Sequence, residues 1–322
     1  MSRAQQISRR IKLRHLDMFV TVVEQGSMAQ AAEQLGTLQP VVSKAIAELE
    51  QTVGAQLFDR GPRGVTPTIY GRSLFKRSKA IFDELRTSVN ELEVLADPTA
   101  GELRIGSTEA CAVGLTPAII DRMARKFPRI AFEVVVADAK TLHERELRGR
   151  LVDLVVGRRL ATATADDLHF TRLHHDRLWV VAGTSSTWTR RKSVTLAELV
   201  DERWCLPPVA HPVGAMVADA FRRCGLRYPD SVVTSQSAPF TSGLVASGQF
   251  LGVLGSLFLG IESPRSGLAI LPVDLRLPGW QTGIMTLTGQ VLNPAVKPFI
   301  ACAREAAASL AAALPASLGG DA

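Results

Sequence analysis

The sequence predicts an α/β protein made of two parts that are joined by a long helix. Between residues 13 and 95, apolar residues recur at helical spacing, with one glycine- and proline-containing interruption near residue 62. From residue 101 onward, short apolar segments typical of strands alternate with helical segments, which is the pattern of an α/β domain. The length of 322 residues suits two domains, each large enough to bury its own core.

The charge of the chain is mildly positive. It carries 37 Lys and Arg against 31 Asp and Glu, a net charge of +6, and residues 1–92 hold 13 basic and 9 acidic residues. The excess favours an anionic partner but does not establish one. No apolar run of about 18 residues and no apolar N-terminal segment occurs, so we expect neither a membrane span nor a signal peptide.

The cysteines and histidines show no metal-binding spacing. The four cysteines lie at 111, 205, 224 and 302, without a CxxC pair, which is typical of a reduced, cytoplasmic protein. The six histidines form no HExxH motif, and the chain has no nucleophile elbow, P-loop or GxGxxG. We therefore expect no metal, no cofactor and no catalytic site.

Two short helices are expected in the first forty residues. The first covers residues 13–25 and ends at Gly26; its apolar face consists of Leu13, Leu16, Phe19, Val20 and Val23. Ser27 begins the second, and Gln30 three residues later makes a capping-box pair with it. Gly36 then provides a tight turn.

A third helix follows, with Thr37 expected as its N-cap. Pro40 would then be the third helical residue, where a missing N–H costs little. Two helices joined by a Gly-containing turn make a helix-turn-helix, whose second helix enters the DNA major groove. The outer face of this third helix carries small or polar residues. It suits base contacts, because Gln pairs with adenine edges and Lys with guanine or phosphate. An ordinary helical hairpin is the alternative. The expected DNA-binding residues in these helices are Ser27, Gln39, Pro40, Ser43 and Lys44.

Residues 57–68, LFDRGPRGVTPT, are expected to form a β-hairpin, or wing. Arg63 at its tip would reach the phosphate backbone or a minor groove, and Arg60 at its base a phosphate. A plain surface turn with exposed arginines is the alternative.

A helix of roughly 26 residues is expected from Tyr70 to Leu95, ending at Asp97-Pro98. Its apolar seam is narrow, so we expect it to pair with its copy in a second subunit. The seam consists of Leu74, Ser78, Ile81, Phe82, Leu85, Val89, Leu92 and Leu95.

The remaining chain is expected to form helices between the strands of a parallel sheet. The expected strands are residues 102–106, 130–138, 151–157, 177–183, 204–207, 231–235, 250–255, 267–273 and 283–289. The expected helices are residues 115–128, 140–150, and those near 195–201, 214–224, 240–247 and 295–313. The tail, 315–322, is expected to be disordered.

The segments LRHLDMFVTVVEQGSMAQAAEQL, QPVVSKAIAELE and GAQLFDRGPRGVTPTIYGRSL together make the chain similar to the LysR-type transcriptional regulators. The family usually reads Ser-Gln-Pro-Ala-Leu-Ser-Arg in its recognition helix. Leu38 stands here for the first Ser and Lys44 for the Arg, and Lys is a point charge where Arg offers a bidentate fork. The resemblance is close over residues 11–95 and looser from 101 to about 300.

The resemblance implies a winged helix-turn-helix over residues 11–69, a dimerisation linker helix over 70–97 and an effector-binding domain over 101–315. The last would resemble a type 2 periplasmic binding protein, with lobe I formed by about 101–172 and 272–315, and lobe II by about 173–271. The implied partners are promoter or operator DNA, a small-molecule inducer, RNA polymerase, and further copies of the chain as a homodimer and homotetramer. The segments LVDERWCLPP and AFRRCGLRYP are similar to a subgroup that controls sugar or aromatic catabolism.

A ligand of such a domain would meet strand ends and helix starts. Each hydroxyl here has helix capping as an alternative role. Glu109, beside the first strand end, would repel an anion, which leaves a neutral or polyhydroxylated ligand open. The expected effector-binding residues are Ser107, Thr108, Thr141, Arg158, Pro207 and Ser237.

Two other functions stay open on the sequence alone. The α/β part by itself would also suit an enzyme or a solute-binding protein, because fold does not determine function. An architectural DNA binder with an empty cleft is the other alternative. The winged N-terminal part and the missing catalytic motif favour a ligand-responsive regulator.

Overall fold

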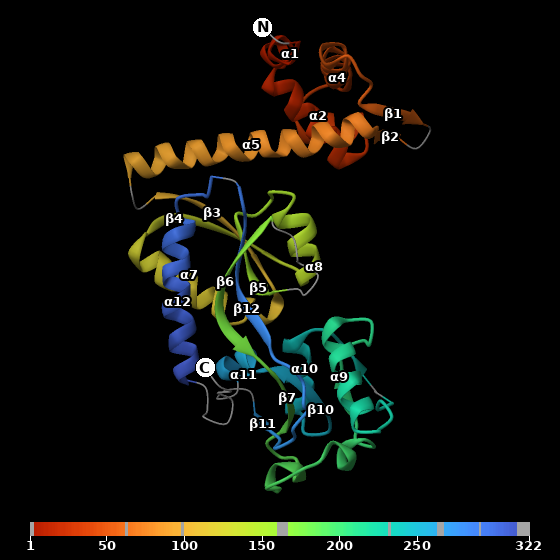
Figure 1. The fold of residues 1–322 in the computed structure, drawn as a ribbon, viewed down its shortest axis with the longest axis vertical. Helices are drawn as coiled ribbons and strands as arrows, with labels where there is room; N and C mark the ends of the chain where they lie inside the picture. The colour runs from red at the N-terminus through yellow and green to blue at the C-terminus, as the bar shows by residue number, and fades with distance from the viewer. Residues whose placement is uncertain are drawn as a thin grey trace. The chain divides into compact units, whose positions relative to one another are not determined.

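The computed structural model describes residues 3–61, 64–97, 100–159, 167–230, 233–262, 267–289 and 291–313. The chain divides into two compact units, Met1–Val89 and Asn90–Ala322. The predictions for the tip of the hairpin, including Arg63, and for the tail lie outside the described residues. Figure 1 shows the order of the elements within each unit.

The N-terminal unit is a small helical domain with one hairpin. Its core is formed mainly by Leu16 and Phe19 of helix α2 with Ile46 and Leu49 of helix α4. The ring centroids of Phe19 and Phe58 lie 5.4 Å apart. The basic helix α1 was not expected. The elements are α1 (Arg3–Arg10), α2 (Leu13–Gln25), α3 (Met28–Gln34), α4 (Gln39–Val53), β1 (Phe58–Gly61), β2 (Gly64–Pro67) and α5 (Ile69–Ala96).

The starts of α3 and α4 differ in how they are capped. Ser27 is the N-cap of α3, as expected, and its hydroxyl accepts the Gln30 N–H at 3.4 Å. The prediction of Thr37 as N-cap of α4 is wrong, because Leu38 has extended backbone and α4 begins at Gln39. The Thr37 N–H donates to the Ala32 carbonyl, so residue 37 belongs to the turn that closes α3. Pro40 is therefore the second helical residue, where its missing N–H still needs no partner.

The hairpin is confirmed and is attached to α4 by a carboxylate. Strands β1 and β2 pair antiparallel, with Phe58 opposite Pro67 and Gly61 opposite Gly64. Glu50 accepts the N–H groups of Leu57 at 2.7 Å and of Phe58 at 3.3 Å. These bonds hold the base of the wing against the end of the recognition helix.

Helix α5 extends the predicted long helix by one residue at each end. Its seam has two parts: Leu74 and Phe82 pack against the N-terminal core, whereas the later positions are exposed. The exposed fraction rises from 41% at Leu85 to 80% at Leu95. A row of exposed apolar side chains on one helix is what pairing with a second chain would bury.

The second unit contains two five-stranded sheets, one in each lobe. The first has the order β4-β3-β5-β12-β6 and the second β11-β7-β10-β8-β9. The strands are β3 (Ala100–Ser107), β4 (Arg129–Val136), β5 (Leu154–Arg158), β6 (Leu168–Asp176), β7 (Leu178–Gly183), β8 (Trp204–Leu206), β9 (Val233–Thr234), β10 (Leu251–Gly255), β11 (Leu268–Ile270) and β12 (Trp280–Leu287).

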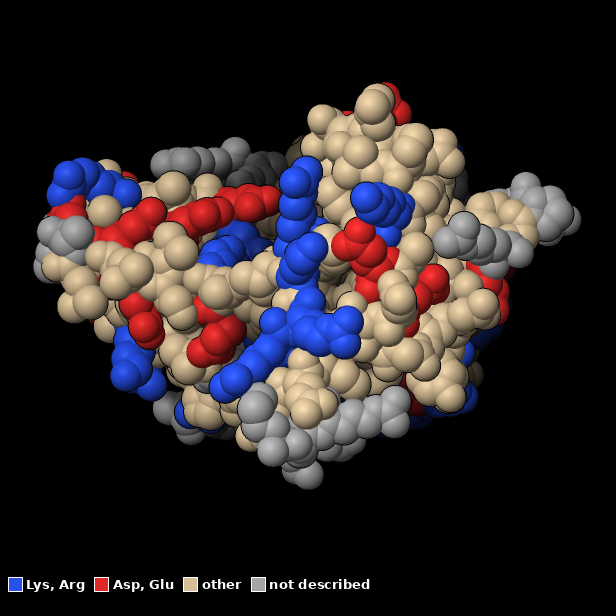
Figure 2. All heavy atoms as spheres, turned by 90° about the horizontal axis from the view of Figure 1, so that it is seen from above, with Lys and Arg blue, Asp and Glu red and all other residues tan. Residues whose placement is uncertain are grey.

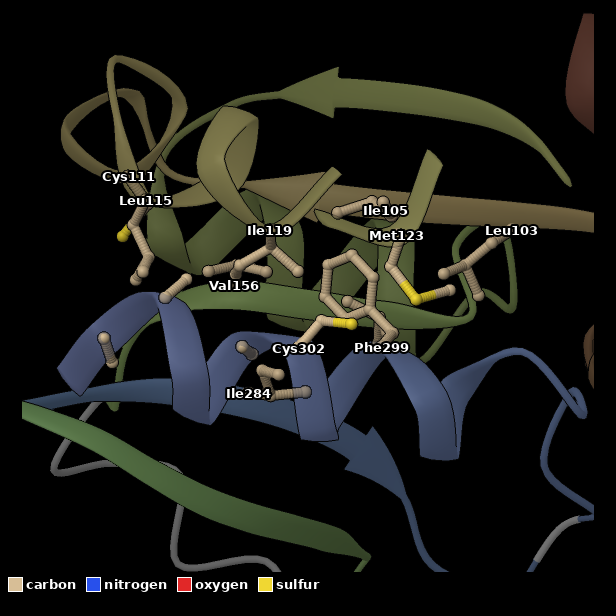
Figure 3. Close-up of a cluster of buried hydrophobic side chains, with 14 of the residues drawn as sticks. Leu103, Ile105, Cys111, Leu115, Ile119, Met123, Val156, Ile284, Phe299 and Cys302 are labelled. Carbon is tan, nitrogen blue, oxygen red and sulfur yellow. The ribbon is translucent and has the colours of Figure 1, made fainter. Parts of the chain in front are cut away.

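Helices cover both sheets, and one of the helical segments is a π-helix. The α-helices are α6 (Glu109–Ala112), α7 (Leu115–Lys126), α8 (Ala139–Thr141), α9 (Pro212–Arg223), α10 (Ala238–Ala246), α11 (Ser256–Glu262) and α12 (Val296–Ala313). The π-helix η1 is Leu142–Leu147, and the 3-10 helices are η2 (Thr187–Arg190) and η3 (Leu196–Leu199). In the core of the first lobe, Phe299 and Cys302 of α12 face Ile119 and Met123 of α7 (Figure 3).

The prediction of a parallel sheet is only partly right, because both sheets are mixed. Strand β3 runs parallel to β4 and β5, but β12 is antiparallel to β5 and β6, and β7 is antiparallel to β10 and β11. The reason is the connection between the lobes. Strand β12 enters the first sheet from the second lobe, and therefore runs against the strands that precede it in the chain.

The crossings between the lobes lie a few residues beyond the expected 172/173 and 271/272. Strand β6 stays in the first sheet as far as Asp176. Leu271 and Leu275 pack in the core of the second lobe with Trp204 and Phe221. After β10 the chain reaches the boundary between the lobes, because Leu257 of α11 packs in the first lobe and Phe258 and Leu259 pack in the second. Sequence periodicity cannot locate such crossings, since a strand keeps its pattern whichever sheet it joins.

We predict that His143 makes the second unit less stable in mild acid. His143 lies in η1 with 1% of its surface exposed, and neither ring nitrogen has a hydrogen-bond partner among the described residues. Burial lowers the pKa of His143 below the ordinary 6.5, and the positive charge of Arg148 lowers it further. The folded state thus disfavours the proton, and the stability that neutral His143 allows is lost as the pH falls from 6.5 through that lower pKa.

The test compares denaturant unfolding at pH 7.5 and 5.0 for wild type, His143→Leu and the exposed-site control His169→Leu. The loss of unfolding free energy on acidification should be smaller in His143→Leu and unchanged in His169→Leu. Equal losses in all three proteins would contradict the assignment.

Candidate functional site

The outer face of α4 carries the residues expected to contact DNA. Gln39, Pro40 and Lys44 are exposed in the first two turns, and Ser43 is half-buried. Leu38 is 71% exposed and Val41 40%, so apolar side chains also lie on this face. Its inner face is held by Val42, Ala45, Ile46 and Leu49.

For the other expected DNA-binding residues, Ser27 and Arg60, the structure shows the following. Ser27 is half-buried at the start of α3, where its hydroxyl already serves as a cap. The backbone of Arg60 pairs with Val65 in the hairpin. Figure 2 shows Lys and Arg side chains gathered into a contiguous group on one face of the molecule.

A cavity of about 430 Å³ lies between the two lobes of the second unit. Its walls are mostly apolar, with a few polar groups, which is the usual character of a small-molecule site. From the first lobe it is lined by Thr108, Glu109, Cys111, Val136, Asp138, Arg158, Asp176, Leu257 and Trp280, among others. From the second lobe come Leu178, Pro207, His211, Val213, Ser237 and Val253, among others.

The structure brings four of the six expected effector-binding residues together at this cavity: Thr108, Arg158, Pro207 and Ser237. Ser107 and Thr141 are not among the residues that line it. The Ser107 hydroxyl is fully buried and lies 2.8 Å from Thr116 Oγ1. The Thr141 hydroxyl donates to Asp138 at 2.5 Å. Both hydroxyls are therefore used inside the first lobe.

Arg158, at the end of β5, has a positive charge that is poorly compensated. Its guanidinium carbon lies 4.8 Å from the centroid of the Trp280 ring, and Nη2 lies 3.4 Å from the sulfur of Met216. Its buried Nε has no hydrogen-bond partner among the described residues. Burial lowers the pKa of Arg158 below its ordinary value, and the charge of Asp176 opposes this. Such a guanidinium suits a carboxylate of a bound molecule.

The three carboxylates at the cavity are already bound by donors of the protein. Asp138 accepts N–H groups at the start of α8, and hydrogen bonds led by that of the Thr141 hydroxyl lower the pKa of Asp138. Asp176 accepts from the Ser256 hydroxyl at 2.6 Å and from the Leu257 N–H at 3.1 Å, while burial raises the pKa of Asp176. Glu109 accepts from the Ser237 hydroxyl at 2.8 Å. Among the described charged side chains that line the cavity, Arg158 is the one with a buried polar atom that lacks a hydrogen-bond partner.

Sequence reasoning did not find Trp280, Asp176 or Asp138. No local motif marks them, because they reach Arg158 or the cavity only through the pairing of distant strands. Among the described residues, no group of His, Cys, Asp or Glu is placed to hold a metal ion. Nor does any helix within the described ranges have the length and apolar character needed to cross a membrane.

Two family models match the chain. Residues 13–72 match the bacterial regulatory helix-turn-helix protein, lysR family, and residues 96–308 match the LysR substrate binding domain. The chain belongs to the LysR family of transcriptional regulators. Proteins of this family bind DNA through the helix-turn-helix, bind small-molecule effectors through the second domain, form oligomers and are not enzymes.

Similar proteins support this family assignment over the full length. The HTH-type transcriptional regulator GbpR of Azospirillum brasilense is 30% identical over 298 residues, which is 92% of this chain and 87% of that protein. The fold is similar to that of a full-length OxyR variant from Pseudomonas aeruginosa, with a TM-score of 0.67, 20% identity, and 95% and 98% of the two chains covered. Full-length CbnR in complex with its target DNA gives a TM-score of 0.52 at 18% identity, covering 92% and 100%.

Proposed function

We propose that this LysR-family regulator responds to an effector that carries a carboxylate and binds in the cavity between the lobes. The observation that supports this is Arg158, which lines the cavity, stacks on Trp280 and has no hydrogen-bond partner for its Nε among the described residues. Thr108, Pro207 and Ser237 would complete the contacts. The largely apolar walls suit an aromatic or sugar-derived acid, in agreement with the sequence similarity to regulators of such catabolism.

The Glu109 carboxylate is compatible with an acidic effector bound at Arg158. On its sequence position alone it would repel an anion, which leaves a neutral or polyhydroxylated ligand open. In the fold, both oxygens of its carboxylate accept hydrogen bonds from the start of α10. A charge whose hydrogen bonds are satisfied in this way opposes an acid at Arg158 less than a free carboxylate would.

For the DNA-binding unit we propose base contacts by Gln39, Pro40, Ser43 and Lys44, with apolar contacts from Leu38 and Val41 to thymine methyl groups. Ser27 and the wing arginines, Arg60 and Arg63, would contact the DNA backbone.

We propose that α5 pairs two chains and that dimers assemble into a tetramer in the cytoplasm. The effector would favour one arrangement of the lobes, changing the spacing of the paired DNA-binding units and the access of RNA polymerase.

The experiment is a footprint on the upstream DNA of the protein's own gene, with and without a panel of aromatic and sugar acids and their neutral alcohols. We expect a long protected region that shortens or shifts with one acid and not with its alcohol. A protected region that changes only with a neutral compound would refute the proposal that the effector carries a carboxylate. Absence of protection at low salt would refute operator binding there, because phosphate contacts are strongest at low salt.

We predict that Gln39→Ala relaxes the operator sequence at one base pair. Loss of a good bidentate contact should cost about 1–3 kcal/mol of discrimination against the wrong base. Gln51→Ala is the matched control, because Gln51 is exposed on the C-terminal half of the same helix. Selection from a randomised operator pool should give a degenerate position for Gln39→Ala only. An unchanged motif would remove Gln39 from the set of base-reading residues.

A further inference from the structure

Glu109 joins the two lobes across the cavity. It lies in α6 of the first lobe, and its carboxylate accepts from the Ser237 hydroxyl at 2.8 Å and from the Ala238 N–H at 3.2 Å. Ser237 is the N-cap of α10, in the second lobe, and its hydroxyl oxygen also accepts the Phe240 N–H at 3.3 Å. A carboxylate from one lobe thus fills the start of a helix that belongs to the other.

The start of a helix attracts anions, because its first N–H groups lack helical partners and carry a partial positive charge. In this cavity Glu109 supplies that anion from within the protein. Asp138 differs, since it bonds to α8 of the first lobe. Asp176, at the end of β6, bonds to the start of α11, which directly follows β10 of the second sheet. Glu109 is therefore the one of these three acids that bonds to α10 of the second lobe.

We propose that Glu109 determines the charge of the effector: the cavity accepts one anionic group, at Arg158, and excludes a second at the start of α10. This inference rests on the proposed acidic effector. A dicarboxylate would have to place its second carboxylate next to Glu109 or displace Glu109 from its donors. Like charges in a partly desolvated cavity repel strongly, whereas a hydroxyl or amine at that end can donate to the Glu109 carboxylate.

The first test needs no ligand and measures amide hydrogen exchange in α10 of the full-length protein. Glu109→Ala should accelerate exchange of the Ala238 amide by about tenfold or more, as expected for loss of a hydrogen bond to a charged group. Glu198→Ala is the control, because Glu198 caps η3 in the second lobe through Thr195 and does not line the cavity. Equal exchange of Ala238 in wild type and Glu109→Ala would overturn the bridge between the lobes.

The second test measures thermal stabilisation by matched acids: benzoate against terephthalate, and gluconate against glucarate. We expect the wild type to be stabilised by a monoacid and not by its diacid, and Glu109→Gln to accept the diacid as well. A diacid that stabilises the wild type as much as its monoacid does would overturn the inference. Absence of any stabilisation would count against the proposed effector class, and the exchange experiment would still decide whether Glu109 bridges the lobes.

Discussion

Arg158→Met should abolish the response to an acidic effector while leaving operator binding by the ligand-free protein unchanged. The guanidinium lines the cavity, its Nε has no hydrogen-bond partner among the described residues, and Trp280 holds it in place. Truncating one member of a buried, hydrogen-bonded charge pair costs about 2–5 kcal/mol of binding free energy. The dissociation constant should therefore rise at least about 30-fold.

The measurement is thermal shift and calorimetric titration with the acid that alters the footprint. Arg159→Met is the matched control, because Arg159 is the next residue, is exposed and stacks on Phe170 instead of lining the cavity. Arg158→Lys should bind with intermediate affinity, since lysine keeps the charge but loses the planar fork. Wild-type affinity in Arg158→Met would show that the acid binds elsewhere.

Gly71→Ala should destabilise the DNA-binding unit by about 3 kcal/mol, at the upper end of the usual cost of overpacking, and so weaken operator binding. A Cβ at Gly71 would lie 2.1 Å from the Leu57 carbonyl oxygen and 3.1 Å from the Pro67 Cβ. The first of these atoms belongs to the backbone at the base of the wing, which is also held by Glu50. The added methyl group cannot be accommodated by a side-chain rotation and must displace the hairpin or α5.

Gly61→Ala tests whether this effect is specific to position 71. Gly61 lies in β1 of the same hairpin, and a Cβ there would meet no atom of the described residues within 4 Å. Denaturant unfolding and operator titration should show a large loss for Gly71→Ala and a change of at most about 0.5 kcal/mol for Gly61→Ala. Similar stability of the two variants would mean that the hairpin and α5 can separate freely.

Several elements of the DNA-binding unit could be predicted from short segments of sequence. The spacing of Leu16, Phe19 and Val20 predicts α2, and the Gly-Pro-Arg-Gly turn predicts the wing, because these patterns depend on neighbours a few residues apart. The N-cap of α4 was misplaced by one residue, since Thr37 and Leu38 compete for the same boundary and the closure of α3 decides between them.

The residues that line the cavity between the lobes could be predicted only in part. Thr108, Arg158, Pro207 and Ser237 were found because strand ends and helix starts gather at one edge of an α/β lobe. Ser107 and Thr141 also lie at a strand end and a helix start, but their hydroxyls form hydrogen bonds within the first lobe. A rule about positions along the chain does not say which way a hydroxyl points.

Local spacing and motifs shared with relatives were enough to predict the family, the helix-turn-helix, the wing, the long helix α5 and most strands. The antiparallel course of β12, the stacking of Arg158 on Trp280 and the bond from Glu109 to the start of α10 became visible only in the folded chain. Glu109 and Ser237 are 128 residues apart in the chain, and Arg158 and Trp280 are also distant. Only the packing of two lobes against each other brings such pairs within a few ångströms, and no local pattern records it.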